Sequence, residues 1–392
     1  MAIMNTVISG GGSTPTGTKQ ITTNGTHDVA AYEYADVQVP TTAPEIYRVF
    51  RVNNGKIENS ISTPFLPLPN TATDIGDYCY TYAYRDTPAS VLSGTINLSS
   101  LTTISGTSSC QYMFQNCTGI TSVDLSSLTT VSSNYACSHM FYGCTGLTSV
   151  DLSSLTTVSG VNACNSMFQG CNGLTSIDLS SLATVSGGNG CSYMFNDCTG
   201  MTSVDLSSLT TLSGSGACNS MFFGCAGLTS INLSSLTTAS GANACASMFQ
   251  NCTGLTSINL SSLTTISGNS ACASMFSSCT GLTTAKLNAL NAMSVQMSLS
   301  YAQMFPSCTH LESVEFGGLT ASTFASKKDQ IAYLFNNTTG RDAPNGCTVH
   351  FPSNFDPSDP NHTFDASTLT GYPTFGGSAS YIHVAFDLPA SE

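Results

Sequence analysis

Tryptophan and charged side chains are scarce in this chain, and their scarcity excludes some functions. Tryptophan is absent, and Asp, Glu, Lys and Arg together account for 8% of the 392 residues. No Lys or Arg occurs between Arg85 and Lys286, and the whole chain has a formal net charge of −13. Because proteins bind nucleic acid through basic residues that neutralise phosphates, we expect no nucleic-acid partner.

Long apolar runs are missing as well. The chain has no apolar run of the roughly 18 or more residues that a membrane-spanning helix requires, so no such helix is predicted. Residues 1–12 lack a basic stretch followed by a long apolar stretch. We therefore expect no secretory signal peptide at this end of the sequence.

No arrangement typical of a catalytic centre is found. The six histidines are scattered, at His27, His139, His310, His350, His362 and His383. A nucleophilic cysteine needs an adjacent base, but His139, the one histidine well inside the repeats, has no counterpart in the other repeats. We interpret it as a surface residue. A glycine-rich loop with a phosphate-binding lysine is also missing, so we predict a protein without enzymatic activity or cofactor.

What the chain does contain is a 27-residue repeat that begins at Cys110 and continues to about residue 308. Residues 137–155 carry the pattern Cys-x-x-Met-Phe-x-x-Cys, followed by Leu, Val, Asp and Leu at fixed spacing. One period later residues 164–182 repeat it, and further copies open at Cys191, Cys218, Cys245 and Cys272. Self-similarity at a fixed period in this range predicts a solenoid, in which each coil packs on its neighbours.

Two apolar periods alternate within each unit. Val150, Asp151 and Leu152 alternate inward, outward and inward, which predicts a strand, and a second extended segment follows at 155–158. The residues Cys164, Met167, Phe168 and Cys171 have spacings of three, four and seven, which predict one face of a short helix. The predicted fold class is therefore an α/β repeat solenoid whose 27-residue coils each contain a strand, an extended segment and a short helix.

These units resemble the BspA-like leucine-rich repeats of bacterial surface proteins, including the Met-Phe-x-x-Cys variant common in mycoplasma-type lipoproteins. The resemblance covers about 200–250 of the 392 residues. It implies a leucine-rich-repeat-like solenoid and is weak evidence for any ligand. One departure is that the last position of the general leucine-rich pattern, often Asn or Cys, is a leucine here, as at Leu128, Leu155 and Leu182.

The chain has seventeen cysteines, and fourteen of them occupy the paired positions of the repeat. The first column comprises Cys110, Cys137, Cys164, Cys191, Cys218, Cys245 and Cys272, and the second comprises Cys117, Cys144, Cys171, Cys198, Cys225, Cys252 and Cys279. On a helix, two cysteines seven apart lie about 10.5 Å apart along the axis, too far for a disulfide. We interpret both columns as buried thiols in the core. Bridges between neighbouring repeats and metal binding are the alternatives, and free thiols would indicate folding in a reducing cytoplasm.

Polar residues at the strand centre form another column, the aspartate column. Its members are Asn97, Asp124, Asp151, Asp178, Asp205, Asn232 and Asn259, and Lys286 follows. Carboxylates one strand apart repel by roughly 0.8 kcal/mol per neighbouring pair in water, so something should offset them. We consider this column a candidate ligand-binding face. A solvated acidic stripe and calcium bound between coils remain alternatives, although Ser149 and Ser153 are poor calcium ligands, and we predict no metal site.

Residues 1–43 are predicted to form a separate β module. Residues 19–29 predict two short strands around an Asn-Gly turn, and a further strand is expected from Tyr32 to Val39. The pattern I-T-x-N-G-T-x-D-V followed by Y-x-x-V-x-V-P resembles short modules near the N-termini of tail and virion-associated proteins of gut bacteriophages and prophages. The resemblance covers about 25 residues and implies attachment to other virion proteins. An ordinary capping hairpin is the alternative.

The remaining segments are predicted to close the two ends of the solenoid. Residues 44–109 are interpreted as a β-rich N-terminal cap with a degenerate first coil, and 110–326 as the solenoid. Residues 327–392 are interpreted as a C-terminal cap and tail, with closing strands at 347–352 and 381–387. Caps are needed because a solenoid otherwise exposes apolar core at its ends.

Together these features predict a virion-associated repeat protein, folded in the bacterial cytoplasm, that presents an extended surface to a bacterial cell-surface protein or glycan. One alternative is a bacterial BspA-like adhesin located at the cell surface. Another is a purely structural filament or capsid component. A homo-oligomer is compatible with each of them.

Overall fold

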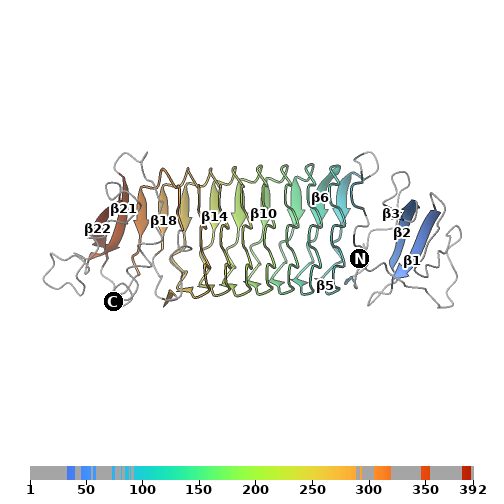
Figure 1. The fold of residues 1–392 in the computed structure, drawn as a ribbon, viewed down its shortest axis with the longest axis horizontal. Coiled ribbons are helices and arrows are strands. Elements are labelled where there is room, and N and C mark those ends of the chain that lie inside the picture. The colour runs from blue at the N-terminus through green and yellow to red at the C-terminus, as the bar shows by residue number, and fades with distance from the viewer. Residues whose placement is uncertain are drawn as a thin grey trace.

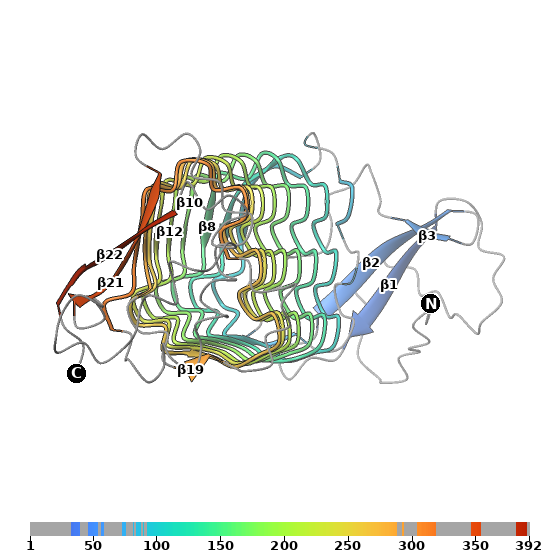
Figure 2. The ribbon, with the colours of Figure 1, turned by 60° about the vertical axis from the view of Figure 1, so that its left-hand side comes forward.

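The computed structural model describes residues 33–39, 46–53, 56–58, 73–75, 81, 84–87, 89, 92–287, 292–293, 304–318, 346–353 and 382–389. Coils from residue 94 onward stack along one axis (Figure 1). Seen closer to that axis, the coils nearly superimpose (Figure 2). The described residues contain no helix that could cross a membrane.

One side of each coil carries a short strand that pairs in parallel with its neighbours. The first sheet consists of β4 (Gly94–Asn97), β6 (Ile120–Asp124), β8 (Ser149–Asp151), β10 (Ser176–Asp178), β12 (Ser203–Asp205) and β14 (Ser230–Asn232). The same side continues in a second sheet of β16 (Ser257–Asn259), β18 (Thr284–Lys286), β20 (Ser313–Glu315), β21 (Cys347–Pro352) and β22 (Ile382–Leu388). We call this side the strand face.

The second extended segment of each coil forms an eight-stranded parallel sheet of two-residue strands. These strands are β5 (Thr103–Ile104), β7 (Thr130–Val131), β9 (Thr157–Val158), β11 (Thr184–Val185), β13 (Thr211–Leu212), β15 (Thr238–Ala239), β17 (Thr265–Ile266) and β19 (Ala292–Met293). On the strand face and in the sheet of two-residue strands, the central coils keep one register. For example, Val150 pairs with Val123, and Thr184 pairs with Thr157. The predicted 27-residue coil is therefore confirmed.

The predicted short helix is wrong, because the segment with the Met-Phe pair is a run of turns. In the coil at 162–171, alternate N–H groups donate to different acceptors. Met167 N donates to Cys164 O within the coil at 3.2 Å, whereas Phe168 N donates to Met194 O of the next coil at 2.8 Å. A helix would direct successive N–H groups to carbonyls four residues earlier in its own segment. In this segment half of the N–H groups donate to carbonyls of the next coil, and these hydrogen bonds hold neighbouring coils together.

Left-handed residues make this arrangement possible. Asn162, Ser166 and Gly170 have φ of 54°, 53° and 73°, so every fourth residue reverses the backbone. Asn and Gly tolerate this conformation better than most residues. Two four-residue turns place apolar residues at spacings of three, four and seven, as a helix does, so the apolar spacing alone could not separate the two structures.

The core between the faces is built from stacked phenylalanines. Eight rings, one per coil, follow one another at Phe114, Phe141, Phe168, Phe195, Phe222, Phe249, Phe276 and Phe305. Neighbouring centroids lie 5.1 to 5.6 Å apart, with interplanar angles of 1° to 12°. Offset stacking of this kind adds to the gain from burying large apolar surfaces. Each ring is fully buried, so each coil depends on its neighbours.

Both cysteine columns are buried in this core as predicted, and the sixteen described cysteines are free thiols. In the second column each thiol from Cys144 onward donates to a phenylalanine carbonyl of the preceding coil, as Cys171 Sγ does to Phe141 O at 3.2 Å, whereas Cys117 Sγ donates to Tyr84 O at 2.9 Å. Burial raises the pKa of Cys198 to about 12. The helical distance that we used to exclude bridges within a coil does not apply, because no helix is present there.

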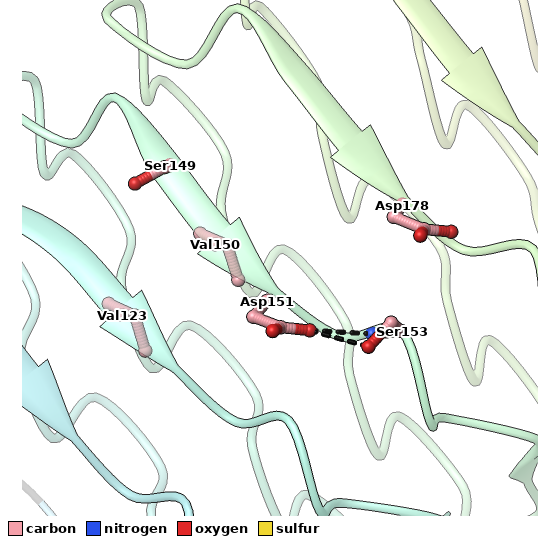
Figure 3. A pocket seen from close by; sticks show the side chains of 6 residues that line it. All are labelled: Val123, Ser149, Val150, Asp151, Ser153 and Asp178. Carbon is pink, nitrogen blue, oxygen red and sulfur yellow. Dashed lines mark hydrogen bonds between the residues drawn. The ribbon is translucent and has the colours of Figure 1, made fainter.

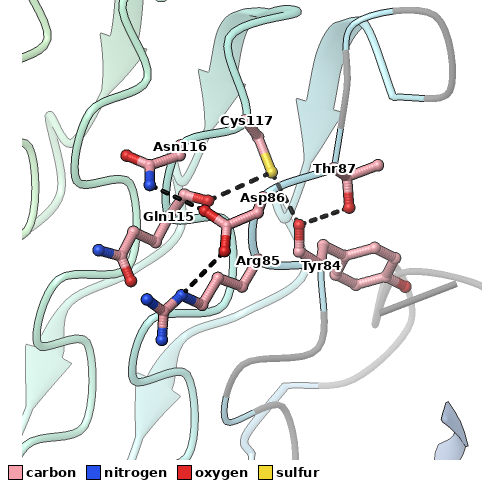
Figure 4. Close-up of polar contacts among 7 residues, drawn as sticks. All are labelled: Tyr84, Arg85, Asp86, Thr87, Gln115, Asn116 and Cys117. Atoms are coloured by element: carbon pink, nitrogen blue, oxygen red, sulfur yellow. Dashed lines mark hydrogen bonds and ion pairs between the residues drawn. The ribbon is translucent and has the colours of Figure 1, made fainter. Parts of the chain in front are cut away.

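A half-coil at 84–87 covers the N-terminal end of the phenylalanine stack. Its polar contacts with residues 115–117 are drawn in Figure 4. The Tyr84 ring stacks on Phe114 at 5.1 Å, and Tyr84 N donates to Met113 O at 2.8 Å. Beside it, Asn116 Nδ2 donates to Asp86 Oδ1 at 2.8 Å, and Arg85 Nε lies 3.2 Å from Asp86 Oδ2. This half-coil supplies part of the N-terminal cap predicted in 44–109.

The predicted strands outside the coils are present where the structure describes them. β1 (Glu33–Val39) pairs antiparallel with β2 (Ile46–Asn53), which pairs with β3 (Lys56–Glu58). The β1–β2 pairing joins segments that the sequence analysis divides at residue 43. The predicted hairpin at 19–29 lies outside the described residues. At the other end, β21 and β22 confirm the two closing strands and extend the strand face.

Adjacent glycines in one turn are expected to respond oppositely to substitution. A Cβ at Gly187 would overlap the carbonyl oxygen of Gly160 in the preceding coil, whereas a Cβ at Gly188 would meet only Ser215 O at 3.8 Å. Gly187→Ala should therefore destabilise the protein by about 1–3 kcal/mol through overpacking. Gly188→Ala, the matched control, should be neutral or stabilising by about 0.4–1 kcal/mol. Urea unfolding measures both, and equal effects would contradict the close approach of the coils.

Candidate ligand-binding face

The aspartate column lies on the strand face in register. Asn97 pairs with Asp124, Asp124 with Asp151, and Asp151 with Asp178, and the pairing continues through Asp205 to Asn232. Asn259 continues the column on the second sheet, where it pairs with Lys286. All these side chains are exposed except Asp124, which is partly buried. The predicted outward orientation is therefore confirmed.

Each member of the column accepts a hydrogen bond from the backbone two residues later. Asp151 Oδ1 accepts from Ser153 N at 3.1 Å and from Ser153 Oγ at 2.7 Å (Figure 3). The backbone contact recurs at Asn97, Asp124, Asp178, Asp205, Asn232 and Asn259, at 2.9 to 3.2 Å. Backbone N–H groups favour the charged form of a carboxylate. These contacts offset the repulsion between neighbouring aspartates.

At Asp178 these hydrogen bonds lower the pKa of the carboxyl group. The hydroxyl and backbone N–H of Ser180 hold the pKa of this carboxyl below its usual value, against a smaller opposing effect of burial. Asp178 is therefore ionised at neutral pH. At Asp151 both hydrogen bonds use Oδ1, which leaves Oδ2 open to solvent.

A second exposed column, the serine column, runs parallel to the aspartates. It comprises Ser149, Ser176, Ser203, Ser230 and Ser257, each two residues before a column aspartate or asparagine. Their hydroxyls make no hydrogen bond to other described residues, unlike Ser122, whose hydroxyl lies 2.6 Å from Thr95 Oγ1. The serines of this column were not among the candidate ligand-binding residues predicted from the sequence. The alternation that exposes Asp151 also exposes Ser149, and this signal was available.

Between the two columns the surface is shallowly hollowed over an aliphatic floor. One hollow is lined by Val123, Val150, Asp151 and Asp178 together with Ser149 and Ser153 (Figure 3). A neighbouring hollow extends over β10, β12 and β14, with Ile177, Val204 and Ile231 between the serines and the acidic or amide side chains. The strand face therefore offers hydroxyl groups on one side, carboxylates on the other and alkyl groups between them.

The column changes character toward the C-terminal end. Lys286 pairs with Glu315 in register, and its Nζ lies 3.1 Å from Glu315 Oε2. Next, His350 on β21 lies opposite Glu315, and its Nδ1 is 2.8 Å from Asp387 Oδ1 on β22. Lys286 and Glu315 thus form an ion pair and His350 contacts Asp387, whereas the stretch from Asp124 to Asp205 carries carboxylates with no basic neighbour among the described residues.

Metal binding by this face finds no support in the geometry. Within the described residues, no group of three or more His, Cys, Asp or Glu side chains converges on a point. Consecutive aspartates point outward in parallel, and each already serves a backbone N–H. A calcium site needs six or more oxygens around one centre.

His139 is half-buried, which differs from the fully surface position expected for it. Its ring stacks on Tyr112 at 4.6 Å and tilts against Tyr142 at 5.7 Å, while Nδ1 lies 2.8 Å from Ser138 Oγ. Burial lowers the pKa of His139. Cys137, two residues away, is fully buried in the core, so the structure does not bring a reactive thiol and this imidazole together at the surface.

Comparison with known proteins agrees with the repeat geometry. The chain matches the BspA type leucine rich repeat region, in six copies, over residues 51–185, 111–245, 164–293 and 192–328. The protein is therefore a leucine-rich repeat solenoid. The chain belongs to the BspA-type leucine-rich repeat family, and the matched segments span both cysteine columns and the whole aspartate column.

One solved structure with similarity to this chain is that of a leucine-rich repeat protein from Bacteroides ovatus. It is 17% identical, and the alignment covers 86% of this chain and 99% of that chain, with a TM-score of 0.28. No curated protein matches the chain.

Substitutions at Asp178 should separate the hydrogen-bond role of the column from its charge. Asp178→Ala removes the acceptor for Ser180 N and should lower the free energy of unfolding by about 0.5–1.5 kcal/mol. Asp178→Asn keeps an acceptor, as Asn232 and Asn259 do naturally, and should be nearly neutral at pH 7.

The pH dependence gives a second readout of the same carboxylate. Because the folded pKa of Asp178 lies below its usual value, its contribution is present above the unfolded pKa of about 3.9 and is lost as the pH falls through the folded value. The difference in urea midpoint between wild type and Asp178→Ala should therefore shrink below about pH 4. A loss at pH 7 that is equal in both variants would contradict the hydrogen-bond role.

Proposed function

We propose that this protein is a non-enzymatic scaffold that presents its strand face to a repeating, hydroxyl-rich ligand, such as a glycan of a bacterial cell surface. The observation that carries the proposal is the pairing of two exposed polar columns, serine and aspartate, repeated at the spacing of parallel strands, about 4.8 Å. Unbonded serine hydroxyls donate and accept, and carboxylate oxygens such as Asp151 Oδ2 accept. An aliphatic floor between them suits the apolar faces of sugar rings.

We further propose that the protein is part of a virion, attached through residues 1–43. The support is the N-terminal sequence pattern, which resembles modules of phage tail and virion-associated proteins. The core offers a second argument, because sixteen free, buried thiols suit folding in a reducing cytoplasm before release. The competing proposal is a surface adhesin of a bacterium. Membership of the BspA-type repeat family supports this alternative.

Binding to bacterial surface polysaccharides on a glycan array tests the proposed face. The variant Ser176→Ala/Ser203→Ala/Asp205→Asn removes two hydroxyls and one charge from the second hollow. The amide oxygen of Asn at position 205 can still accept the hydrogen bond from Ser207 N. We expect it to fold normally and to lose at least tenfold in affinity, since several hydrogen bonds are lost together.

A matched control lies on the other sheet. Ser186 and Ser213 are exposed next to the two-residue strands, so Ser186→Ala/Ser213→Ala removes hydroxyls away from the strand face. This control should bind as wild type does. Binding that is lost in the control, or kept in the strand-face variant, would show that another surface carries recognition.

The location of the protein is tested independently by immunogold imaging. We expect antibodies against the solenoid to label phage-like particles released by cells that carry the gene, and a chain lacking residues 1–43 not to be incorporated. Labelling of the cell envelope in place of particles would favour the adhesin. End-to-end filaments with buried strand faces would favour a purely structural component.

A further inference from the structure

The first cysteine column differs from the second in the partners of its sulfurs. Cys245 Sγ lies 3.1 Å from Cys272 Sγ of the next coil. Cys137 with Cys164, and Cys191 with Cys218, occupy the equivalent positions on adjacent coils. Because one sulfur can join only one bridge, the Cys245–Cys272 contact divides the column into three pairs on neighbouring coils, each enclosed in the core.

Backbone pairing holds these cysteines at a separation that a disulfide accepts. The N–H of Cys137 donates to Ala163 O at 2.7 Å, and the N–H of Cys245 donates to Ala271 O at 2.8 Å, so each pair sits on directly adjacent coils. Neighbouring parallel segments lie about 4.8 Å apart. The Cα separation of disulfides ranges from about 4.4 to 6.8 Å.

The second column is arranged differently, although its coil spacing is the same. From Cys144 onward its thiols donate to phenylalanine carbonyls of the preceding coil, as Cys225 Sγ does to Phe195 O and Cys252 Sγ does to Phe222 O, both at 3.1 Å. A backbone acceptor thus orients each of these sulfurs. In the first column Cys245 Sγ also has a backbone acceptor, Ala271 O at 3.0 Å, but the sulfur of Cys272 is a further partner at 3.1 Å.

We propose that the first column is an oxidation site at which a hydroperoxide converts three thiol pairs, Cys137–Cys164, Cys191–Cys218 and Cys245–Cys272, into disulfides between coils. The second column stays reduced. This inference is independent of the ligand and of the location proposed above.

The chemistry requires one peroxide for each bridge. A thiolate of the pair attacks one oxygen of hydrogen peroxide, the O–O bond breaks, and a sulfenic acid and water result once a proton reaches the leaving hydroxide. The neighbouring thiol then attacks the sulfenic sulfur. An S–S bond forms, the S–O bond breaks and a second water leaves, so that two electrons pass from the two sulfurs to the peroxide.

Burial sets the rate of this reaction. Hydrogen bonding from the neighbouring thiol and enclosure in the core raise the pKa of Cys137, Cys191 and Cys245 well above the usual value for cysteine. Thiolate is therefore scarce, and oxidation should be slow in the folded protein. Each bridge would then close a loop of one repeat and restrict the unfolded chain, so that the oxidised rod resists unfolding more than the reduced one.

Peptide mapping of the full chain after peroxide treatment tests the proposal. Reduced protein is incubated overnight with hydrogen peroxide, unfolded in the presence of an alkylating reagent and digested without reductant. We expect six of the seventeen thiols to be lost, three disulfide-linked peptide pairs that match the proposed bridges, and a higher urea midpoint that a reductant reverses.

Two serine variants sharpen the result. Cys245→Ser should lose four thiols and keep the other two linked pairs, whereas Cys252→Ser, the matched control from the second column, should still lose six. Retention of all thiols, oxidation to sulfinic acid without linked peptides, or bridges within the second column or between Cys164 and Cys191 would each overturn the proposal. The wild-type peptide map decides the question even if a variant does not fold.

Discussion

Hydrogen bonding between successive coils is the constraint on which the rest of this structure depends. It operates on the strand face, on the sheet of two-residue strands and, less expectedly, along the turns, where Phe168 N donates to Met194 O of the next coil. Because bonds of this kind fix the coil spacing on every side, equivalent side chains fall into columns. The phenylalanine stack, the thiol columns and the aspartate column are consequences of that one register.

The register also explains how an acidic face can be tolerated. Column aspartates in a single file would repel one another, but each accepts a backbone N–H two residues later, and asparagines stand at both ends of the acidic stretch. The same residue therefore closes the turn after the strand and presents charge to solvent. The proposed binding role of this face would add to its structural role and would not replace it. For this reason Asn and Ala are expected to differ at Asp178.

Most of the fold could be predicted from the sequence, since the 27-residue period, a strand centred on 150–152 and an extended segment at 155–158 follow from spacing alone. The short helix could not be separated from turns in that way. Apolar spacings of three, four and seven fit both structures, and the deciding residues, Asn162, Ser166 and Gly170, act through backbone conformation and not through burial. Asn, Ser or Gly occupies most of these every-fourth positions, and this recurrence was a partial signal, since Tyr112, His139 and Tyr193 adopt the same conformation.

By itself the sequence determined the repeat, the buried thiols and the outward aspartates, because periodicity fixes which side chains share a face. Only the tertiary structure decided what those side chains contact. It directs the second-column thiols to phenylalanine carbonyls, places Cys245 Sγ 3.1 Å from Cys272 Sγ, and leaves the Ser149 hydroxyl open beside Asp151. These partners lie one coil away, and rotamers and backbone conformation select among neighbours that the repeat pattern makes equivalent.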